Sequence, residues 1–255
     1  MNSFVLVYYG NSGSSWLIEA LGGGPDVLVP AFEPLESWAW KASDAEKADW
    51  IRVVFNPPEE LQGDDLAAWL EKLRKTPQFV ELKKTSFSHV AFKMTSSAFK
   101  NRDRFLEVVE ETESKLVFLR RDNRVKHALS LYRYHEEKKS QFDHAGVRPP
   151  SRVELRTFDK WLRSSSALDR ELSALTDTAL ARLGAERVAT VTYEEFVDDD
   201  GKRAVLDRLT DFLSIRQSAT SVFKKATADD LRRAVVNYDE LKHRYRKTEF
   251  ARFFD

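Results

Sequence analysis

A short loop of small polar residues is the part of this sequence best suited to chemistry. The loop spans residues 10–15 (GNSGSS) and follows the apolar run at residues 4–7 after two tyrosines. Apolar residues then recur at helical spacing from Trp16 to Leu21, which predicts a helix beginning near residue 14. We therefore expect a tight turn that ends on a helix N-terminus.

Such a turn is a good place for an anion. The first N–H groups of a helix lack partners within the helix and carry the positive end of its dipole. Gly10 and Gly13 let the backbone approach a ligand closely, and Ser12, Ser14 and Ser15 add hydroxyl donors. A phosphate or sulfate group would fit, although an ordinary serine N-cap explains the same residues without a ligand.

Composition excludes several other kinds of chemistry. The chain has 255 residues, of which 41 are basic and 41 acidic, so no overall field attracts nucleic acid or an anionic membrane. It has no cysteine, which excludes thiolate catalysis and disulfides and fits a reducing cytoplasm. The five histidines show no metal-ligand spacing. With no signal peptide or transmembrane segment visible, we expect a soluble cytoplasmic protein, a single domain over residues 1–255, with no metal.

Apolar runs alternate with helical patterns along the whole chain. This alternation predicts an α/β fold, with a mainly parallel sheet of about five strands and helices on both faces. Ligands of such sheets bind beyond the carboxyl ends of the strands. The predicted strands are residues 4–7, 27–29, 90–92, 116–119 and 187–191, and the helices are 14–21, 43–54, 64–75, 101–112, 124–138, 156–183, 204–213 and 229–255.

Cations follow two of the predicted strands. Lys93 comes directly after the third, and Arg120 and Arg121 come at the end of the fourth. Since parallel strands end at one edge of a sheet, we expect these side chains near the loop at residues 10–15, in one anion-binding cleft. The alternatives are a surface cation at Lys93 and an arginine cluster that only forms ion pairs with Asp122.

The loop after the second strand carries two carboxylates and several aromatic rings. Glu33 and Glu36 are candidates for a general base, or else ordinary solvated side chains. Phe32, Trp38 and Trp40 are more typical of a core than of a sugar platform, although a sugar ring would stack well on tryptophan.

The ordered set of motifs resembles the sulfotransferases that use 3′-phosphoadenosine 5′-phosphosulfate (PAPS). NSGSSWL at residues 11–17 is similar to the phosphosulfate loop of that family, [KR]-[ST]-G-[ST]-[ST]-W-L. FLRRDNRVKHALSLY resembles its second signature, a strand that ends in arginine before a helix with a serine. TYEEFVDD at 192–199 and NYDELKHRYRKTEF at 237–250 are similar to two further segments of the family. The LRRD form and the glutamate-bearing loop are most similar to bacterial carbohydrate sulfotransferases, including those that sulfate trehalose.

This resemblance implies a P-loop-like parallel sheet and a set of roles. Arg120 or Arg121, together with Ser130, would bind the 3′-phosphate, and Lys93 would stabilise the bridging oxygen of PAPS. The acceptor would be a hydroxyl group of a carbohydrate, a lipid or another small molecule, and the product nucleotide would be adenosine 3′,5′-bisphosphate (PAP). The implied phosphosulfate-binding residues are Asn11, Ser12, Gly13, Ser14, Ser15 and Trp16.

Two departures from the family pattern bear on activity. Asn11 stands where the family has lysine or arginine, and an amide carries no charge to offset that of the phosphosulfate. Thr95 stands where the cytosolic enzymes have a histidine base, so the base must come from elsewhere, and Glu33, or else Glu36, is our candidate. A nucleotide-binding protein with little or no transfer is therefore an alternative. A P-loop kinase or NTPase fits less well, because G-x-x-x-x-G-K-[ST] is missing.

Overall fold

The computed structural model describes residues 2–36, 40–58, 63–74, 87–137, 149–196, 199–216 and 230–254. Within these ranges, five strands form one all-parallel sheet in the order β2-β3-β1-β4-β5. The predicted α/β fold with a parallel sheet of about five strands is thus confirmed. The strands are β1 (Asn2–Tyr8), β2 (Val27–Leu28), β3 (His89–Thr95), β4 (Lys115–Arg120) and β5 (Val188–Thr192).

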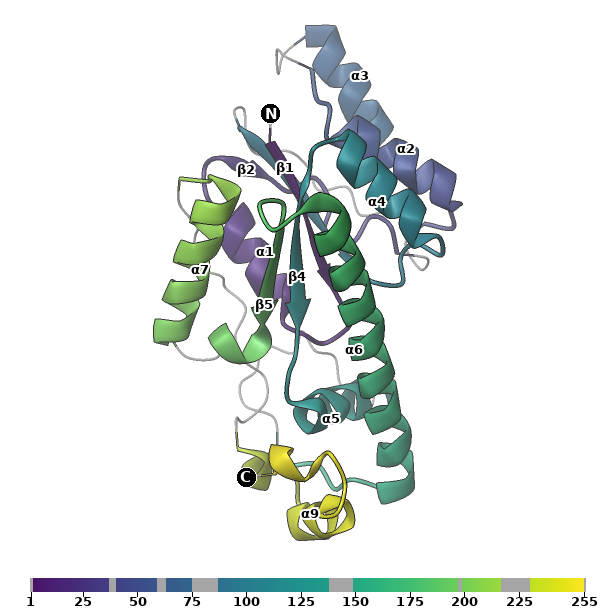
Figure 1. Cartoon of the computed structure of the whole chain (residues 1–255), viewed down its shortest axis with the longest axis vertical. Coiled ribbons are helices and arrows are strands. Elements are labelled where there is room, and N and C mark those ends of the chain that lie inside the picture. Colours follow the sequence, from purple (N-terminus) through teal and green to yellow (C-terminus); the bar gives the residue numbers. More distant parts are fainter. Residues whose placement is uncertain are drawn as a thin grey trace.

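Helices cover both faces of the sheet, as predicted (Figure 1). One face packs against α1 (Ser14–Gly22) and α7 (Asp199–Leu213). The other face packs against helices that come from four separate stretches of the chain. These are α2 (Asp44–Val54), α3 (Gly63–Leu73), α4 (Arg102–Glu111) and α6 (Leu155–Leu183).

Alternation along β1 decides which side chains face which layer. Val5 and Val7 belong to the cluster of α2, α4 and α6, whereas Leu6 and Tyr8 belong to the cluster of α1 and α7. Lys93 pairs in register with Leu6 and so lies on the α1 side of the sheet. The predicted third strand ended at residue 92, but β3 continues to Thr95, which places Lys93 inside a strand.

A third cluster lies beyond the carboxyl ends of the strands (Figure 1). It joins α5 (Arg124–His135) and the start of α6 to the C-terminal elements α8 (Leu231–Ala234), α9 (Tyr238–Tyr245) and η2 (Ala251–Phe253). The prediction of one helical region over 229–255 is wrong, because Val235 is extended and forms a parallel β-bridge with Ser151. Helix α8 therefore ends after one turn.

Arg133 ties this C-terminal cluster to α5. The side chain is almost fully buried, at 1% exposure. Its Nε donates to Ser151 Oγ at 2.8 Å, and a terminal nitrogen donates to the Ala234 carbonyl at 2.8 Å. A buried cation with several acceptors is a structural link rather than a surface charge.

For the Arg133→Met variant we expect the free energy of unfolding to fall by about 2–4 kcal/mol, because buried acceptors lose charged donors. Urea denaturation followed by circular dichroism measures the change. The control is Arg152→Met, whose side chain is 71% exposed and should tolerate the same replacement. Equal midpoints for both variants would contradict the structural role of Arg133.

Candidate functional site

The loop at residues 10–15 makes a tight turn that contains two left-handed residues. Asn11 and Gly13 both have left-handed backbone angles, with φ of 64° and 86°, and Gly13 is the N-cap residue of α1. A Cβ atom at Gly13 would lie 2.8 Å from the ring of Tyr193. Only glycine fits there, since both the angle and the space exclude a side chain.

A buried lysine faces the start of α1 from the neighbouring strand. The Lys93 ammonium donates to Ser15 Oγ at 2.8 Å and to Ser14 Oγ at 3.4 Å, and it lies 5.1 Å from the centre of the Tyr8 ring. The side chain is only 4% exposed. Burial, opposed by the charges of two glutamates, lowers the pKa of Lys93 below its ordinary value. The alternative of a surface cation is therefore wrong.

Glu33 is the counter-ion of this lysine. Its Oε1 lies 2.8 Å from Lys93 Nζ and also accepts a hydrogen bond from the Tyr8 hydroxyl. The Lys93 N–H donates to the Phe32 carbonyl at 3.0 Å, which holds the glutamate loop against β3. Burial and the adjacent Glu33 carboxylate raise the pKa of Tyr8 well above its ordinary value, so Tyr8 acts as a donor.

Glu36 has a different environment from Glu33. Its two oxygens accept from the Thr95 N–H at 2.7 Å and from the Thr95 hydroxyl at 2.9 Å, at the end of β3. The residue is 7% exposed, and burial raises its pKa above the ordinary value. Neither glutamate is an ordinary solvated side chain, but it is Glu33 that pairs with Lys93, the lysine that also contacts the serines of α1.

The aromatic residues of the glutamate loop are spread over different environments. Phe32 is 36% exposed beside Glu33, whereas Trp40 packs against the core cluster of α2 and α4. Trp38 lies outside the described residues. Of the two described rings, Trp40 serves the core as expected and Phe32 does not.

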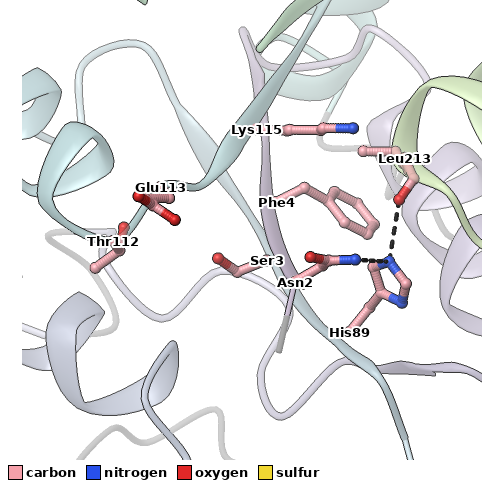
Figure 2. A pocket seen from close by; sticks show the side chains of 8 residues that line it. All are labelled: Asn2, Ser3, Phe4, His89, Thr112, Glu113, Lys115 and Leu213. Atoms are coloured by element: carbon pink, nitrogen blue, oxygen red, sulfur yellow. Dashed lines mark hydrogen bonds between the residues drawn. The ribbon is translucent and has the colours of Figure 1, made fainter. Parts of the chain in front are cut away.

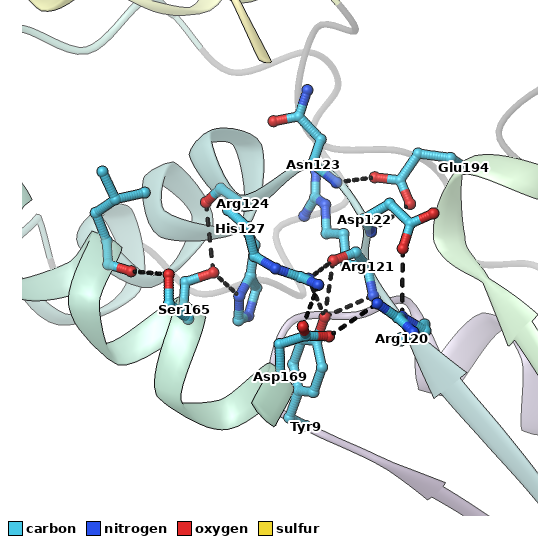
Figure 3. A network of polar contacts seen from close by, with 12 residues as sticks. Tyr9, Arg120, Arg121, Asp122, Asn123, Arg124, His127, Ser165, Asp169 and Glu194 are labelled. Atoms are coloured by element: carbon cyan, nitrogen blue, oxygen red, sulfur yellow. Dashed lines mark hydrogen bonds and ion pairs between the residues drawn. The ribbon is translucent and has the colours of Figure 1, made fainter. Parts of the chain in front are cut away.

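The two consecutive arginines at the end of β4 point to different neighbours (Figure 3). Arg121 is buried, donates to the Asn11 carbonyl at 3.3 Å and stacks its guanidinium 4.4 Å from the centre of the Tyr193 ring. Arg120 is 39% exposed and pairs with Asp122 at 3.3 Å and Asp169 at 3.4 Å. Only Arg121 lies against the loop.

The TYEEF segment contacts both the start of α1 and the residues that follow β4. In η1 (Tyr193–Phe196), the Glu194 carboxylate accepts from the backbone N–H groups of Asp122 and Asn123 at 2.8 and 3.0 Å (Figure 3). The Phe196 ring stacks on Trp16 with 4.8 Å between centres. The sequence pointed to this segment only through family resemblance, and its contacts come from two distant loops, which no local pattern reveals.

His127 fixes the start of the loop. Its Nε2 lies 2.7 Å from the Gly10 carbonyl and its Nδ1 lies 2.7 Å from Ser165 Oγ (Figure 3 shows the contact with Ser165). A carbonyl can only accept, so Nε2 carries the proton and Nδ1 accepts from the serine. Burial, with smaller contributions from Arg121 and Arg124, lowers the pKa of His127 to about 3. The ring is therefore a neutral, buried packing residue.

Ser130 lies farther along α5, one turn beyond Lys126, and is partly exposed. Lys126 was not among the predicted binding residues. Burial and the nearby Arg121 charge lower the pKa of Lys126, so the two cations are close enough to interact. The role of Ser130 stays a prediction, and Lys126 adds a second cation to the surface that Ser130 shares.

Some buried donors of the predicted binding residues that the structure describes have no hydrogen-bond partner. Within the described ranges, Ser12 Oγ and Arg121 Nε are buried and make no hydrogen bond. Such groups are costly to leave unpaired, and an anion seated on the loop would supply acceptors. The donor set of amides, hydroxyls, a lysine and an arginine suits a phosphate or sulfate ester. Among those same residues, no group of His, Asp or Glu side chains is placed to hold a metal ion.

A small cavity of about 100 Å³ lies at the opposite edge of the sheet (Figure 2). It is formed where β1 and β3 begin, next to the end of α7, and so is remote from the loop at residues 10–15. His89 closes it by contacts with Asn2 and the Leu213 carbonyl (Figure 2). The lining residues are Asn2, Ser3, Phe4, His89, Thr112, Glu113, Lys115 and Leu213.

Comparison with solved structures identifies the fold. A sulfotransferase from Alicyclobacillus acidocaldarius aligns with 99% of this chain and 92% of its own, at 16% identity and a TM-score of 0.50. The sulfotransferase domain of the Synechococcus PCC 7002 olefin synthase aligns with 100% of this chain and 86% of its own, at 17% identity and a TM-score of 0.50. No family model and no curated protein sequence matches the chain.

The chain therefore has the fold of sulfotransferases, as its motifs predicted. At these identities the likeness extends to the fold alone. None of the helices in the described ranges is both long and apolar enough to cross a membrane.

The buried, neutral His127 leads to a prediction about how folding stability depends on pH. The unfolded chain binds a proton at the ordinary pKa of 6.5, whereas the folded chain resists protonation down to a pKa of about 3. The unfolded state therefore holds more protons in this range, and the stability that His127 contributes is lost as the pH falls below 6.5. The His127→Gln variant keeps a donor for Gly10 but cannot be protonated in this way. Below pH 6.5 we expect the free energy of unfolding of the wild type to fall, relative to that of the variant, by about 1.4 kcal/mol per pH unit.

Urea denaturation of both proteins at pH 7.5 and pH 5.5 gives this difference. The wild-type protein should lose more stability on acidification than the variant. Parallel losses in the two proteins would mean that His127 does not remain neutral in the folded chain.

Proposed function

We propose that this chain is a PAPS-dependent sulfotransferase that transfers a sulfuryl group to an acceptor hydroxyl. The observation that carries the proposal is the buried Lys93 ammonium, which lies on the serines at the N-terminus of α1 and beside the Glu33 carboxylate. A cation, helix N–H groups and a carboxylate base are what sulfuryl transfer needs at one point. The sulfotransferase fold supports the same assignment.

In this proposal each residue has one task. The loop N–H groups with Ser14 and Ser15 hold the phosphosulfate, and Lys93 donates to the bridging oxygen as charge develops there. Arg121, with Lys126 and Ser130 as neighbours, binds the 3′-phosphate. Bound PAPS supplies the sulfuryl group and a bisphosphate leaving group. The acceptor oxygen forms its bond to sulfur as the bond to the bridging oxygen breaks, and Glu33 takes the hydroxyl proton.

Glu33 is preferred to Glu36 as the base because of their contacts. Both oxygens of Glu36 accept hydrogen bonds from Thr95, so that carboxylate is committed to the end of β3. Glu33 shares one oxygen between Tyr8 and Lys93, and 22% of its side chain is exposed beside the exposed Phe32 ring. An acceptor with an apolar or sugar ring could lie on Phe32 and present its hydroxyl to Glu33.

A second candidate is a nucleotide-binding protein with little transfer activity, and Asn11 favours it. The amide removes a charge that would stabilise the transition state. A kinase or NTPase remains less favoured, because the loop has neither the Walker lysine nor its spacing. Use of a carbohydrate, lipid or small-molecule acceptor in the cytoplasm, without nucleic acid, stays a prediction.

Calorimetric titration with PAP, compared with ATP and Mg²⁺, tests the cofactor class. We expect PAP to bind at micromolar concentrations and ATP to bind far more weakly, because Arg121 and Lys126 can recognise a 3′-phosphate that ATP lacks. Arg121→Met should weaken PAP and leave ATP unchanged. Equal binding of the two nucleotides, or no binding of PAP, would reject the proposal.

Replacement of the proposed base separates transfer from binding. With labelled PAPS and a panel of sugar, phenol and alcohol acceptors, Glu33→Gln should lower kcat by about a hundredfold, since the proton acceptor is lost. Affinity for PAP should be kept. The control is Glu107→Gln on the exposed surface of α4, and full activity of the Glu33 variant would show that another group is the base. Tight PAP binding with no transfer by wild type to any acceptor would favour the second candidate.

A further inference from the structure

Tyr8 has no counterpart among the sequence motifs, yet it contacts the proposed base. It is the last residue of β1 and is 4% exposed, on the α1 side of the sheet. Its hydroxyl donates to Glu33 Oε1, and its ring faces the Lys93 ammonium. The next residue, Tyr9, points to the opposite side and contacts Arg121 and Arg124 instead. Tyr8 therefore serves the glutamate and not the arginines.

The contacts of Lys93 explain why Glu33 needs this second donor. An ammonium group has three N–H donors, and Lys93 uses them on Ser14, Ser15 and Glu33. To donate to the bridging oxygen of a phosphosulfate, the lysine must release one of these acceptors. An anion on the loop also draws the ammonium away from Glu33, because both compete for one positive charge. The Tyr8 hydroxyl then remains as a donor to the same carboxylate oxygen, because its hydrogen bond does not depend on Lys93.

We infer that Tyr8 is a positioning residue that keeps the Glu33 carboxylate in place when Lys93 turns to the phosphosulfate. This inference rests on the proposed function. The phenol is suited to the task because it is neutral and does not compete for the anion. It sits on a strand, so its position is fixed by the register of β1 with β3. The adjacent Ser14 hydroxyl also lies near the phenol, which orients the ring from the helix side.

The Tyr8→Phe variant tests the inference, because it removes one hydroxyl and keeps the packing of the ring. We expect kcat to fall about ten- to a hundredfold, since a charge-assisted hydrogen bond to the base is lost. The KM for PAPS and the affinity for PAP should stay within about twofold. The matched control is Tyr238→Phe, a buried tyrosine of the C-terminal cluster whose hydroxyl donates to the Phe254 carbonyl. Unchanged kcat in Tyr8→Phe, or an equal loss in the control, would overturn the inference.

A second measurement does not depend on transfer. In protein labelled with ¹³C at the tyrosine Cζ atom, the Tyr8 signal is identified by its loss in Tyr8→Phe. It should shift in Glu33→Gln, which replaces the charged acceptor. On saturation of wild type with PAPS, without an acceptor, we expect the signal to stay at its wild-type position. Movement to the Glu33→Gln position would mean that Tyr8 releases Glu33, and the inference would be wrong.

These outcomes distinguish the two proposals. Failure of PAP and PAPS to bind rejects the proposed function and with it the inference. If binding and transfer are normal but the Tyr8 signal of the PAPS-saturated wild type moves to its position in Glu33→Gln, the inference alone is rejected.

Discussion

The buried ammonium of Lys93 is the interaction on which the site depends. A lysine that is 4% exposed in the middle of a parallel sheet would be costly without a counter-ion. Its position in β3 is fixed by pairing with β1, so the compensating groups must come to it. Glu33, from the loop after β2, and two serines, from the start of α1, contact the ammonium group. The need to pair one charge therefore brings three separate segments to a single point.

Tyr8, the last residue of β1, and Tyr9, which follows it, support opposite sides of the site. Tyr8 points to the α1 side, where Lys93 and Glu33 lie, and Tyr9 points to the other side, where the hydroxyl bridges Arg124 and the backbone of Arg121. His127 reaches the same loop from α5 and holds the Gly10 carbonyl. The loop is thus fixed from both faces of the sheet before any ligand arrives. Preorganised donors of this kind lose little conformational freedom on binding.

The sequence was sufficient for the fold and for part of the site, and the reason is locality. Strand and helix periods are local, and the loop at 10–15 is contiguous, so both could be predicted. Arg133 shows the limit, because it lies on α5 yet its acceptors are on Ser151 and Ala234, far along the chain. The choice between Glu33 and Glu36 was open for the same reason, since Thr95 holds one and Tyr8 holds the other. Side-chain direction at the end of β4 also separates Arg120 from Arg121, which adjacent positions in a sequence cannot do.

The neutral Asn11 changes how charge is distributed along the site. On the loop itself only dipoles remain, and the charge of Lys93 is shared with Glu33. Two further cations lie at the other end, where Arg121 contacts the Asn11 carbonyl and Lys126 is near enough to Arg121 for its pKa to be lowered. Under the proposed function, affinity for the nucleotide would come mainly from its 3′-phosphate, and rate from a single lysine. Binding and transfer would then depend on different residues, which is why one can persist where the other is weak.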